Sequence, residues 1–353
     1  MEPAQEQEIG QSVVQVDVSR SLPSWQPYLS SHPKAGLFHD PRWGQLMQEV
    51  YGAQPFYLTA RREQETVGVL PLVLQRSLLF GRRLCSVPYF DAAGILADDA
   101  EAGDALLAAA GELRDEHRCR AVELRQLQSL SDDLPTRTDK VTMWLDLPEG
   151  RDAMWDQLKS KVRNKLRKAM KNDLEVQSGG GELTGEFYDV YSRNMRDLGS
   201  PPHSRRFFDR LAELFPDEIR LYVARADGRP HAAALGLVNG RTWHLPWSSS
   251  DRRFRNYSAN RLMYWTMLAD AADGGCAWFD FGRSTRDSGT HEFKREWGAE
   301  ELQLHWQHLV AEGAAPPDLR PEKGAFRMLT SLWRRLPVPM ARLLGPRIIA
   351  KLS

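Results

Sequence analysis

Apolar and polar positions along the chain predict the same run of elements twice. In the first half, apolar segments bounded by polar turns predict strands at 56–60, 66–74 and 84–87. A helix is predicted at 101–117, because its apolar residues recur on one face, and a strand at 121–124. The predicted order is strand, strand, strand, helix, strand.

The second half repeats this order. Its pattern predicts strands at 220–226, 231–238 and 242–248, then a helix at 258–272 and a strand at 277–281. Corresponding positions in the two halves lie about 160 residues apart, a spacing that is too long for a solenoid and indicates a duplicated α/β unit.

Helical patterns also occupy the stretch between the two runs, at 151–172, 186–198 and 204–215. A segment rich in Pro and Gly at 313–324 separates the C-terminal residues from the rest. We therefore expect three parts: a first domain at 1–147, a second at 148–312, and a linker and tail at 313–353.

The composition is that of a soluble globular protein, with 42% hydrophobic and 27% charged residues in 353. Three cysteines without a CxxC pair predict neither a disulfide framework nor structural zinc, and scattered histidines predict no metal site. The acidic start is not a signal peptide, and Val67–Leu74, the longest apolar stretch, is too short to span a bilayer. These features predict a cytoplasmic protein without a bound cofactor.

The formal net charge of zero hides a segregation of charge. Residues 159–171 hold seven basic side chains and no acid, and residues 324–353 hold six and again no acid. The rest of the chain therefore carries thirteen more acids than bases. A like-charged helix lacks compensating pairs at helical spacing, so the first segment predicts a polyanion site. The basic residues assigned to it are Lys161, Arg163, Lys165, Arg167 and Lys168. The alternative is a solvated face paired with acids elsewhere.

The segment 279–298 (FDFGRSTRDSGTHEFKREWG) holds the densest candidate chemistry. A strand end supplies Asp280, a loop of small residues carries Arg283 and Arg286, and Thr290 is expected to cap a short helix holding Lys294. Loop N–H groups, a helix N-terminus and guanidinium groups favour an anion pocket beyond a strand end. The alternative is a polar connection without function.

A second candidate stretch lies at 243–260, where Trp247, Tyr257 and Asn260 could line a cleft or serve in the core. The chain has no GxSxG, Walker A or GxGxxG motif, so no covalent nucleophile is indicated.

The segments RNKLRKAMK (163–171), FDFGRS (279–284) and FKREWG (293–298) together resemble the FemAB family, and most closely its exosortase-associated, BioF2-like members. The resemblance covers about residues 39–310. It implies an α/β (α+β) fold of two tandem GNAT-like domains, each a mixed, mostly antiparallel sheet flanked by helices.

The resemblance also implies an activity. It indicates transfer of an acyl or aminoacyl group to an amine of a cell-envelope, peptidoglycan or exopolysaccharide precursor, small or lipid-linked, without a covalent intermediate. Lys294 is expected to meet the donor or a substrate phosphate, and Arg283 and Asp280 to shape the acceptor pocket. Asp280 would take the amine proton if burial raises its pKa. Residues expected to bind substrate are Trp247, Tyr257, Asn260, Ser284, Arg286 and Trp297.

Two departures leave the donor open. Residues 255–260 (RNYSAN) lack the glycines of a coenzyme A phosphate loop, and no inserted helical hairpin for tRNA is visible. Aminoacyl-tRNA, acyl-CoA and an acyl-carrier protein remain candidate donors. The alternatives are a degenerate GNAT pair that binds RNA or a nucleotide-linked precursor, and an acetyl-CoA-dependent N-acetyltransferase.

The tail at 324–353 alternates apolar clusters with basic residues, and its prolines Pro337, Pro339 and Pro346 predict short helical pieces. This pattern favours peripheral contact with anionic lipid at the inner face of the plasma membrane. Packing back onto the acidic body is the alternative. The sequence does not indicate an oligomeric state.

Overall fold

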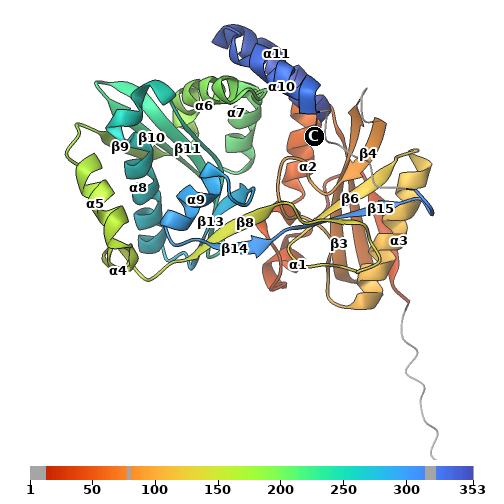
Figure 1. Cartoon of the computed structure of the whole chain (residues 1–353). Coiled ribbons are helices and arrows are strands. Elements are labelled where there is room, and N and C mark those ends of the chain that lie inside the picture. The colour runs from red at the N-terminus through yellow and green to blue at the C-terminus, as the bar shows by residue number, and fades with distance from the viewer. Residues whose placement is uncertain (1–12, 78–80, 315–322, 353) are drawn as a thin grey trace, which may run out of the picture.

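The computed structural model describes residues 13–77, 81–314 and 323–352, which form two sheets side by side (Figure 1). The first sheet has the order β1 (Gln15–Ser19), β2 (Gln54–Arg62), β3 (Glu65–Ser77), β4 (Gly81–Cys85), β6 (Ala121–Gln126), β15 (His305–Val310) and β7 (Thr136–Arg137), with β5 (Leu96–Ala97) beside β3. The second has the order β9 (Glu175–Gly179), β10 (Ile219–Ala226), β11 (Arg229–Asn239), β12 (Thr242–Ser250), β13 (Trp278–Ser284), β8 (Val141–Asp146) and β14 (Glu300–Gln303).

The two sheets confirm the predicted duplication. Each begins with four antiparallel strands, of which the fourth pairs in parallel with the fifth, as β4 does with β6 and β12 with β13. A helix connects these parallel strands in both halves, α3 (Ala100–Glu116) in the first and α8 (Ala259–Asp273) in the second. Every strand and helix expected in the two runs is present, displaced by a few residues at its ends.

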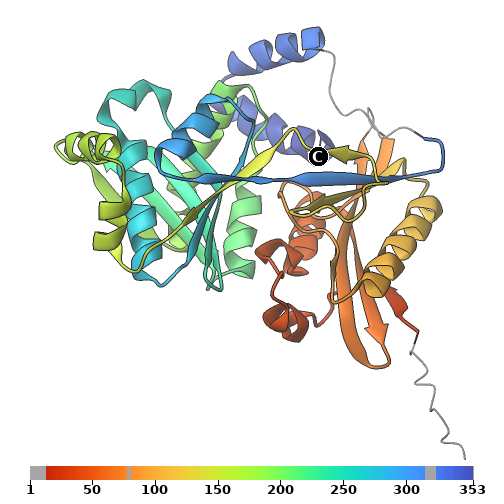
Figure 2. The same ribbon diagram turned by 60° about the horizontal axis from the view of Figure 1, so that its bottom comes forward.

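The halves exchange their last strands. After β7 the chain leaves the first sheet, and β8 joins the second, between β13 and β14. After β14 it returns, and β15 enters the first sheet between β6 and β7. Figure 2 shows this returning strand running across both halves. The expected boundary at 147/148 therefore does not separate the sheets, because strands on either side of it belong to the opposite half.

Helices cover both sheets and fill the space between them. Their bounds are α1 (Gln26–Ser31), α2 (Arg42–Tyr51), α4 (Arg151–Gln157), α5 (Ser160–Ala169), α6 (Thr184–Leu198), α7 (Arg205–Leu214) and α9 (Gly289–Glu296). The helix expected at 151–172 is wrong as a single element. It divides into α4 and α5, because Leu158 and Lys159 adopt extended backbone angles between them.

One hydrophobic core belongs to both halves. Trp43 on α2 is fully buried and stacks on Phe215, which follows α7, with 4.5 Å between the ring centroids. Beside this pair, Arg42 donates to the carboxylate of Glu218 at 2.6 Å and to the carbonyl oxygen of Leu214 at 2.8 Å. Strand exchange and this shared core hold the halves in one fixed arrangement, so a site between them can be preformed.

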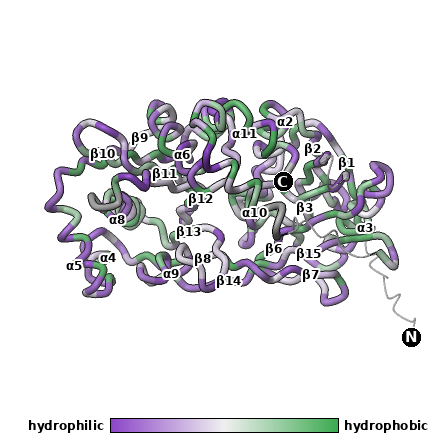
Figure 3. The backbone as a smooth tube through the Cα atoms, turned by 45° about the horizontal axis from the view of Figure 1, so that its top comes forward, coloured by the Kyte–Doolittle hydropathy of each residue, from purple (hydrophilic) through white to green (hydrophobic). Residues whose placement is uncertain are grey.

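The tail forms two helices, α10 (Lys323–Arg334) and α11 (Val338–Leu352), that contact α6. Figure 3 shows α11 lying between α6 and α2, over the junction of the halves. Arg342 donates to Asp189 at 2.7 Å and to Ser192 at 2.8 Å. The side of the tail that contacts α6 therefore packs onto the body, as the alternative prediction stated. Pro346 was expected to end a helical piece, but α11 continues through it. Within the described residues, no helix combines the length and the apolarity needed to cross a bilayer.

Candidate active site

Strands β12 and β13 run in parallel and then separate. Their pairing ends at His244 and Asp280. Beyond this point β12 remains paired with β11, whereas β13 remains paired with β8. Backbone N–H and C=O groups that leave a ladder are free to pair with something else. The fork between the two strands can therefore accept an extended ligand.

Two residues shape the edges of the fork. On β12 the register with β11 shifts at Leu245 and Pro246, and proline has no N–H to offer a ladder. On β13 the register shifts around Gly282, which has a φ of +73°. A Cβ at this position would lie 3.2 Å from the carbonyl oxygen of Leu245. Glycine both permits this left-handed backbone conformation and leaves the gap between the strands open.

A cavity of about 270 Å³ occupies the fork and extends to the first half. Its lining from the second half includes β12, β13 and one face of α9. The first half contributes aromatic and acidic side chains from two loops. The lining residues are Phe38, Tyr89, Phe90, Asp91, His244, Leu245, Pro246, Trp247, Ser248, Tyr264, Asp280, Phe281, Gly282, Arg283, Thr290 and Lys294.

Asp280 is held at the closed end of the fork. Its Oδ1 accepts hydrogen bonds from the Thr142 hydroxyl at 2.7 Å and the Gly282 N–H at 2.8 Å, and its Oδ2 lies 3.1 Å from Nδ1 of His244. Burial acts to raise the pKa of Asp280, but His244 and the hydrogen bonds outweigh it and lower the pKa below its usual value. The expectation that Asp280 acts as the base required a raised pKa, and this condition is not met, because the lowered pKa makes the carboxylate a weak proton acceptor.

His244 takes its orientation from this carboxylate. An ionised carboxylate only accepts hydrogen bonds, so Nδ1 of His244 carries the hydrogen that Asp280 receives. In the neutral imidazole Nε2 is then an acceptor, and it has no hydrogen-bond partner among the described residues. Because His244 lines the cavity, this arrangement can accept a proton from a bound molecule.

Lys294 enters the cavity from α9. Ser288 begins this helix, since its hydroxyl accepts from the His291 N–H; the expected cap, Thr290, lines the cavity instead. The ammonium group of Lys294 donates to the carbonyl oxygens of Gly282 and Arg283 at 2.8 and 2.9 Å. A lysine has three donors, so one remains for a ligand oxygen.

Burial lowers the pKa of Lys294 from 10.5 to about 8, although the charges of Asp280 and Asp91 oppose the shift. The folded protein then loses this proton as the pH rises past 8, whereas the unfolded chain keeps it up to about 10.5. Protonation of Lys294 thus destabilises the fold at neutral pH, and this cost disappears between pH 8 and 10.5.

We expect a corresponding change in stability. Near pH 7 the Lys294→Met variant should have a larger free energy of unfolding than the wild type, because it avoids a cost of up to roughly 3 kcal/mol for burying the charge. The loss of the two hydrogen bonds that Lys294 donates reduces this gain. The difference should shrink towards pH 10. Urea unfolding of both proteins across this range measures it. A difference that stays constant with pH would show that Lys294 does not titrate as described.

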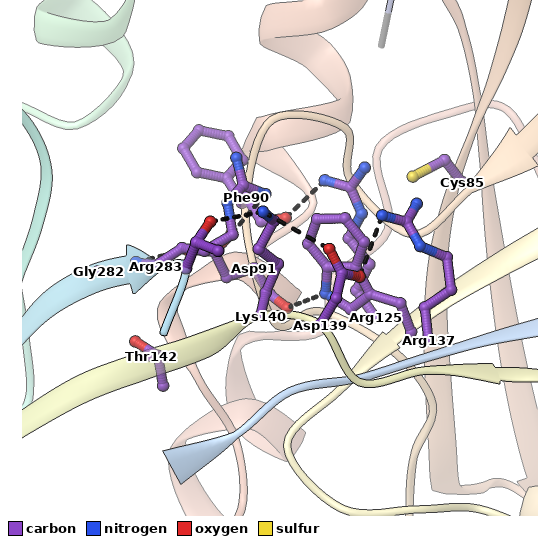
Figure 4. A network of polar contacts seen from close by, with 12 residues as sticks. Cys85, Phe90, Asp91, Arg125, Arg137, Asp139, Lys140, Thr142, Gly282 and Arg283 are labelled. Carbon is purple, nitrogen blue, oxygen red and sulfur yellow. Dashed lines mark hydrogen bonds and ion pairs between the residues drawn. The ribbon is translucent and has the colours of Figure 1, made fainter. Parts of the chain in front are cut away.

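Arg283 connects the site to the first half. Its guanidinium lies 3.0 Å from the Asp91 carboxylate, and its backbone N–H donates to the same carboxylate at 3.2 Å (Figure 4). The guanidinium also lies 5.1 Å from the ring centroid of Trp306, whose indole N–H donates to the Asp91 carbonyl oxygen. Trp306 belongs to the exchanged strand β15, so the exchange positions an acid of one half against an arginine of the other.

The first half has the corresponding end of strand pairing, with an ion pair beside it. Pairing of β4 with β6 ends at Cys85 and Glu123, the positions equivalent to His244 and Asp280. Glu123 is buried in an ion pair with Arg125 at 2.7 Å, and Arg125 donates to the Phe90 carbonyl oxygen at 2.6 Å. This buried pair supports the loop that supplies Phe90 and Asp91 to the cavity of the second half.

The structure separates the predicted site residues into two groups. Asp280, Arg283, Lys294 and Trp247 line one cavity. Trp297 does not: it is 3% exposed and packs in the core beneath α9. The remaining predicted residues lie elsewhere. Ser284 is buried outside the cavity lining, Arg286 pairs with Glu301 and Gln303, Asn260 is not among the lining residues, and the side chain of Tyr257 lies outside the described residues.

The basic helix α5 also lies apart from the cavity lining. It buries Val162, Leu166 and Ala169 and directs its charges outward. Part of the predicted pairing with acids is present, since Lys165 contacts Glu296 at 2.8 Å and Arg163 contacts Asp156 at 3.6 Å. The basic side chains Lys161, Arg167 and Lys168 are exposed, and the described residues provide no acidic partner for them.

Three features of the cavity lining were not predicted from the sequence. They are His244, Asp91 and the stacked rings of Phe38 and Phe90, whose centroids are 4.5 Å apart. A second group also mixes histidine with acids, Asp287, His291 and Glu292, and could hold a metal ion by distance. Both ring nitrogens of His291 are engaged, however, by Glu301 and by the Asp287 N–H.

Part of the sequence matches a known family model. Residues 157–295 match the family model of the acetyltransferase (GNAT) domain, and this segment contains Asp280, Arg283 and Lys294. No curated protein sequence matches the chain.

Solved structures with a similar fold include the following three. FemX has 15% identity and a TM-score of 0.65, over 84% of this chain and 97% of that one. The C-terminal domain of a putative lysylphosphatidylglycerol synthetase from Agrobacterium fabrum has 11% identity and a TM-score of 0.54, over 76% and 88%. A tandem GNAT protein from the clavulanic acid biosynthesis pathway has 14% identity and a TM-score of 0.53, over 86% and 100%. The predicted tandem GNAT fold is therefore confirmed.

Proposed function

We propose that this chain, whose residues 157–295 form a GNAT domain, is an N-acyl- or aminoacyltransferase that acts on an amine of a cell-envelope, peptidoglycan or exopolysaccharide precursor. The observation that carries the proposal is the cavity in the β12–β13 fork. It combines an oriented imidazole, a buried ammonium and an exposed strand edge within the segment that matches the GNAT family.

The similar structures support the direction of the proposal. One of them is named as a lysylphosphatidylglycerol synthetase, and this name describes a product made from an amino acid and a membrane lipid. A fold of this kind is thus compatible with an activated aminoacyl donor and a large envelope acceptor. We place the reaction on the cytoplasmic side of the plasma membrane, with aminoacyl-tRNA, acyl-CoA or an acyl-carrier protein as the donor.

The proposed reaction needs no covalent enzyme intermediate. The neutral acceptor amine attacks the carbonyl carbon of the donor ester or thioester, a C–N bond forms, and the carbonyl oxygen becomes an oxyanion. Collapse of this intermediate breaks the C–O or C–S bond, and the leaving oxygen or sulfur takes up a proton. The products are an amide and an alcohol or thiol, so atoms and charge balance. Holding both substrates in one cavity supplies much of the rate enhancement.

His244 and Lys294 have complementary parts in this scheme. Nε2 of His244 receives the proton that the attacking amine loses, while Asp280 keeps the imidazole in the correct orientation. The ammonium group of Lys294, fixed by two backbone carbonyls, offers its remaining donor to the oxyanion. Arg283, held by Asp91, lines the acceptor side, where it suits an anionic group of the precursor.

The exposed cations of α5 are assigned to the donor in this proposal. Lys161, Arg167 and Lys168 lie on the outer face of the helix, while Lys165 ties α5 to α9 through Glu296. A polyphosphate or RNA donor would release counterions on binding there, which gives affinity that falls steeply with salt.

A thermal-shift screen distinguishes the donors. Acyl-CoAs, a non-hydrolysable aminoacyl-tRNA analogue and an acyl-carrier protein are each added to the full chain as donors, and UDP-linked precursors are added separately as acceptors. One donor class should raise the unfolding temperature, and Trp247→Ala should reduce the shift, since Trp247 lines the cavity. The salt dependence of the shift then tests α5. Absence of a shift with every class would count against the proposal.

A further inference from the structure

The C-terminal helices present an apolar face that nothing in the described structure covers. Met328, Leu329 and Leu332 on α10 are 61%, 60% and 54% exposed, and Met340 and Leu343 on α11 are 47% and 64% exposed. These five belong to a set of fifteen large hydrophobic side chains that are exposed in the described chain. Such a concentration on two adjacent helices indicates an interaction surface rather than scattered surface residues.

The spacing of residues along α11 shows which side of the helix is exposed and which side packs against the body. On α11, Met340, Leu343 and Arg347 recur at intervals of three and four residues and form one ridge. Ala341 and Gly345 face the body instead; Ala341 is fully buried, and a Cβ at Gly345 would lie 2.4 Å from Pro202. The helix is therefore held in place by one side and offers the other to a partner.

Basic side chains extend the apolar ridge. Arg335, Arg347 and Lys351 are exposed and have no acidic partner among the described residues. Arg342, in contrast, is engaged with Asp189 and takes part in docking. Since residues 324–353 contain no acid, the charged side chains of the tail are all basic. This combination fits the headgroup region of an anionic bilayer, which takes apolar side chains below the charged surface.

We propose that α10 and α11 form a docking surface for anionic lipid, defined by Met328, Leu329, Leu332, Arg335, Met340, Leu343, Arg347 and Lys351. Helix α11, which carries part of the surface, lies beside the cavity, because Tyr89 lines the cavity and donates its hydroxyl to the carbonyl oxygen of Ile349 on α11. Its use in bringing a lipid-linked acceptor to the cavity rests on the proposed function. The binding itself does not.

Vesicle co-sedimentation of the full chain tests the surface. Vesicles of phosphatidylcholine alone are compared with vesicles that contain about one third phosphatidylglycerol. We expect binding to the anionic vesicles only, lowered at least fivefold by Leu329→Ser with Leu343→Ser, and also by Arg335→Gln with Arg347→Gln. Leu130→Ser is the matched control, since Leu130 is 38% exposed in the first half. Thermal unfolding checks that every variant is folded.

Equal sedimentation with both kinds of vesicle, or unchanged binding of both double variants, would overturn the inference. So would light scattering that shows a dimer abolished by the leucine changes, in the absence of vesicle binding, because the face would then join two copies. The outcome is separate from that of the transferase proposal. Full vesicle binding without turnover of any donor would remove the proposed function and leave the docking surface standing.

Discussion

Replacement of Lys294 by Met is expected to lower kcat/KM for transfer by on the order of 10²–10³ while the protein remains folded. Methionine has nearly the length of lysine but cannot donate, so the oxyanion loses its charged partner and the carbonyls of Gly282 and Arg283 lose theirs. Because the charge is catalytic, wild-type activity should also fall as the pH rises past about 8, where Lys294 loses its proton. Initial rates across pH measure both effects.

Lys165→Met provides the control. Lys165 contacts Glu296 at the end of the same helix, α9, but it does not line the cavity. This variant removes one positive charge from the α5–α9 contact and should retain the rate of the chemical step, measured at saturating donor. Loss of rate in Lys165→Met equal to that in Lys294→Met would indicate that the helix, rather than the ammonium in the cavity, is what matters.

His244→Ala is expected to lower kcat by about 10²–10⁴, the usual contribution of a general base. The change leaves space where the ring stood, between Asp280 and the cavity. Added imidazole should occupy this space and restore part of the rate. If His244 only stabilised the fold, added imidazole would not restore the rate of the His244→Ala variant. Steady-state rates with and without imidazole measure the effect.

Asp280→Asn tests whether Asp280 orients the imidazole of His244. Asparagine can present an N–H towards His244, which favours the wrong tautomer, so kcat should fall while KM for the donor changes little. Imidazole should not rescue this variant, nor Lys294→Met, because neither creates a vacancy for it. If imidazole restored the rate of His244→Ala, Asp280→Asn and Lys294→Met alike, it would not be acting at the position of the His244 ring, and His244 would not be identified as the base.

The repeated pattern of apolar positions predicted the fold because it depends on local spacing. Strands and helices of both halves follow from alternation and helical recurrence, and FDFGRS with FKREWG placed Asp280, Arg283 and Lys294 together. These residues are close in the chain, so a strand, a loop and a short helix are sufficient to bring them to one place.

Long-range pairing could not be predicted in the same way. Residues 141–146 (VTMWLD) and 305–310 (HWQHLV) are short segments of mixed apolar and polar residues, and nothing local tells which sheet each strand enters. His244 meets Asp280 only through the register of two strands 36 residues apart. Trp297 looks like a cleft residue in sequence, but helix α9 turns it inward. The contribution of Asp91 depends on the exchange of strands between halves.

The central claim is that the cavity in the β12–β13 fork forms an amide between an activated acyl donor and an amine. Mass spectrometry of an amine-bearing UDP-linked precursor, incubated with each donor class and the full chain, tests it most directly. We predict that one donor class adds the mass of its acyl group to the precursor with the wild type, and that Lys294→Met and His244→Ala form far less product. No mass increase with any donor, or equal product from the wild type and both variants, would contradict the claim.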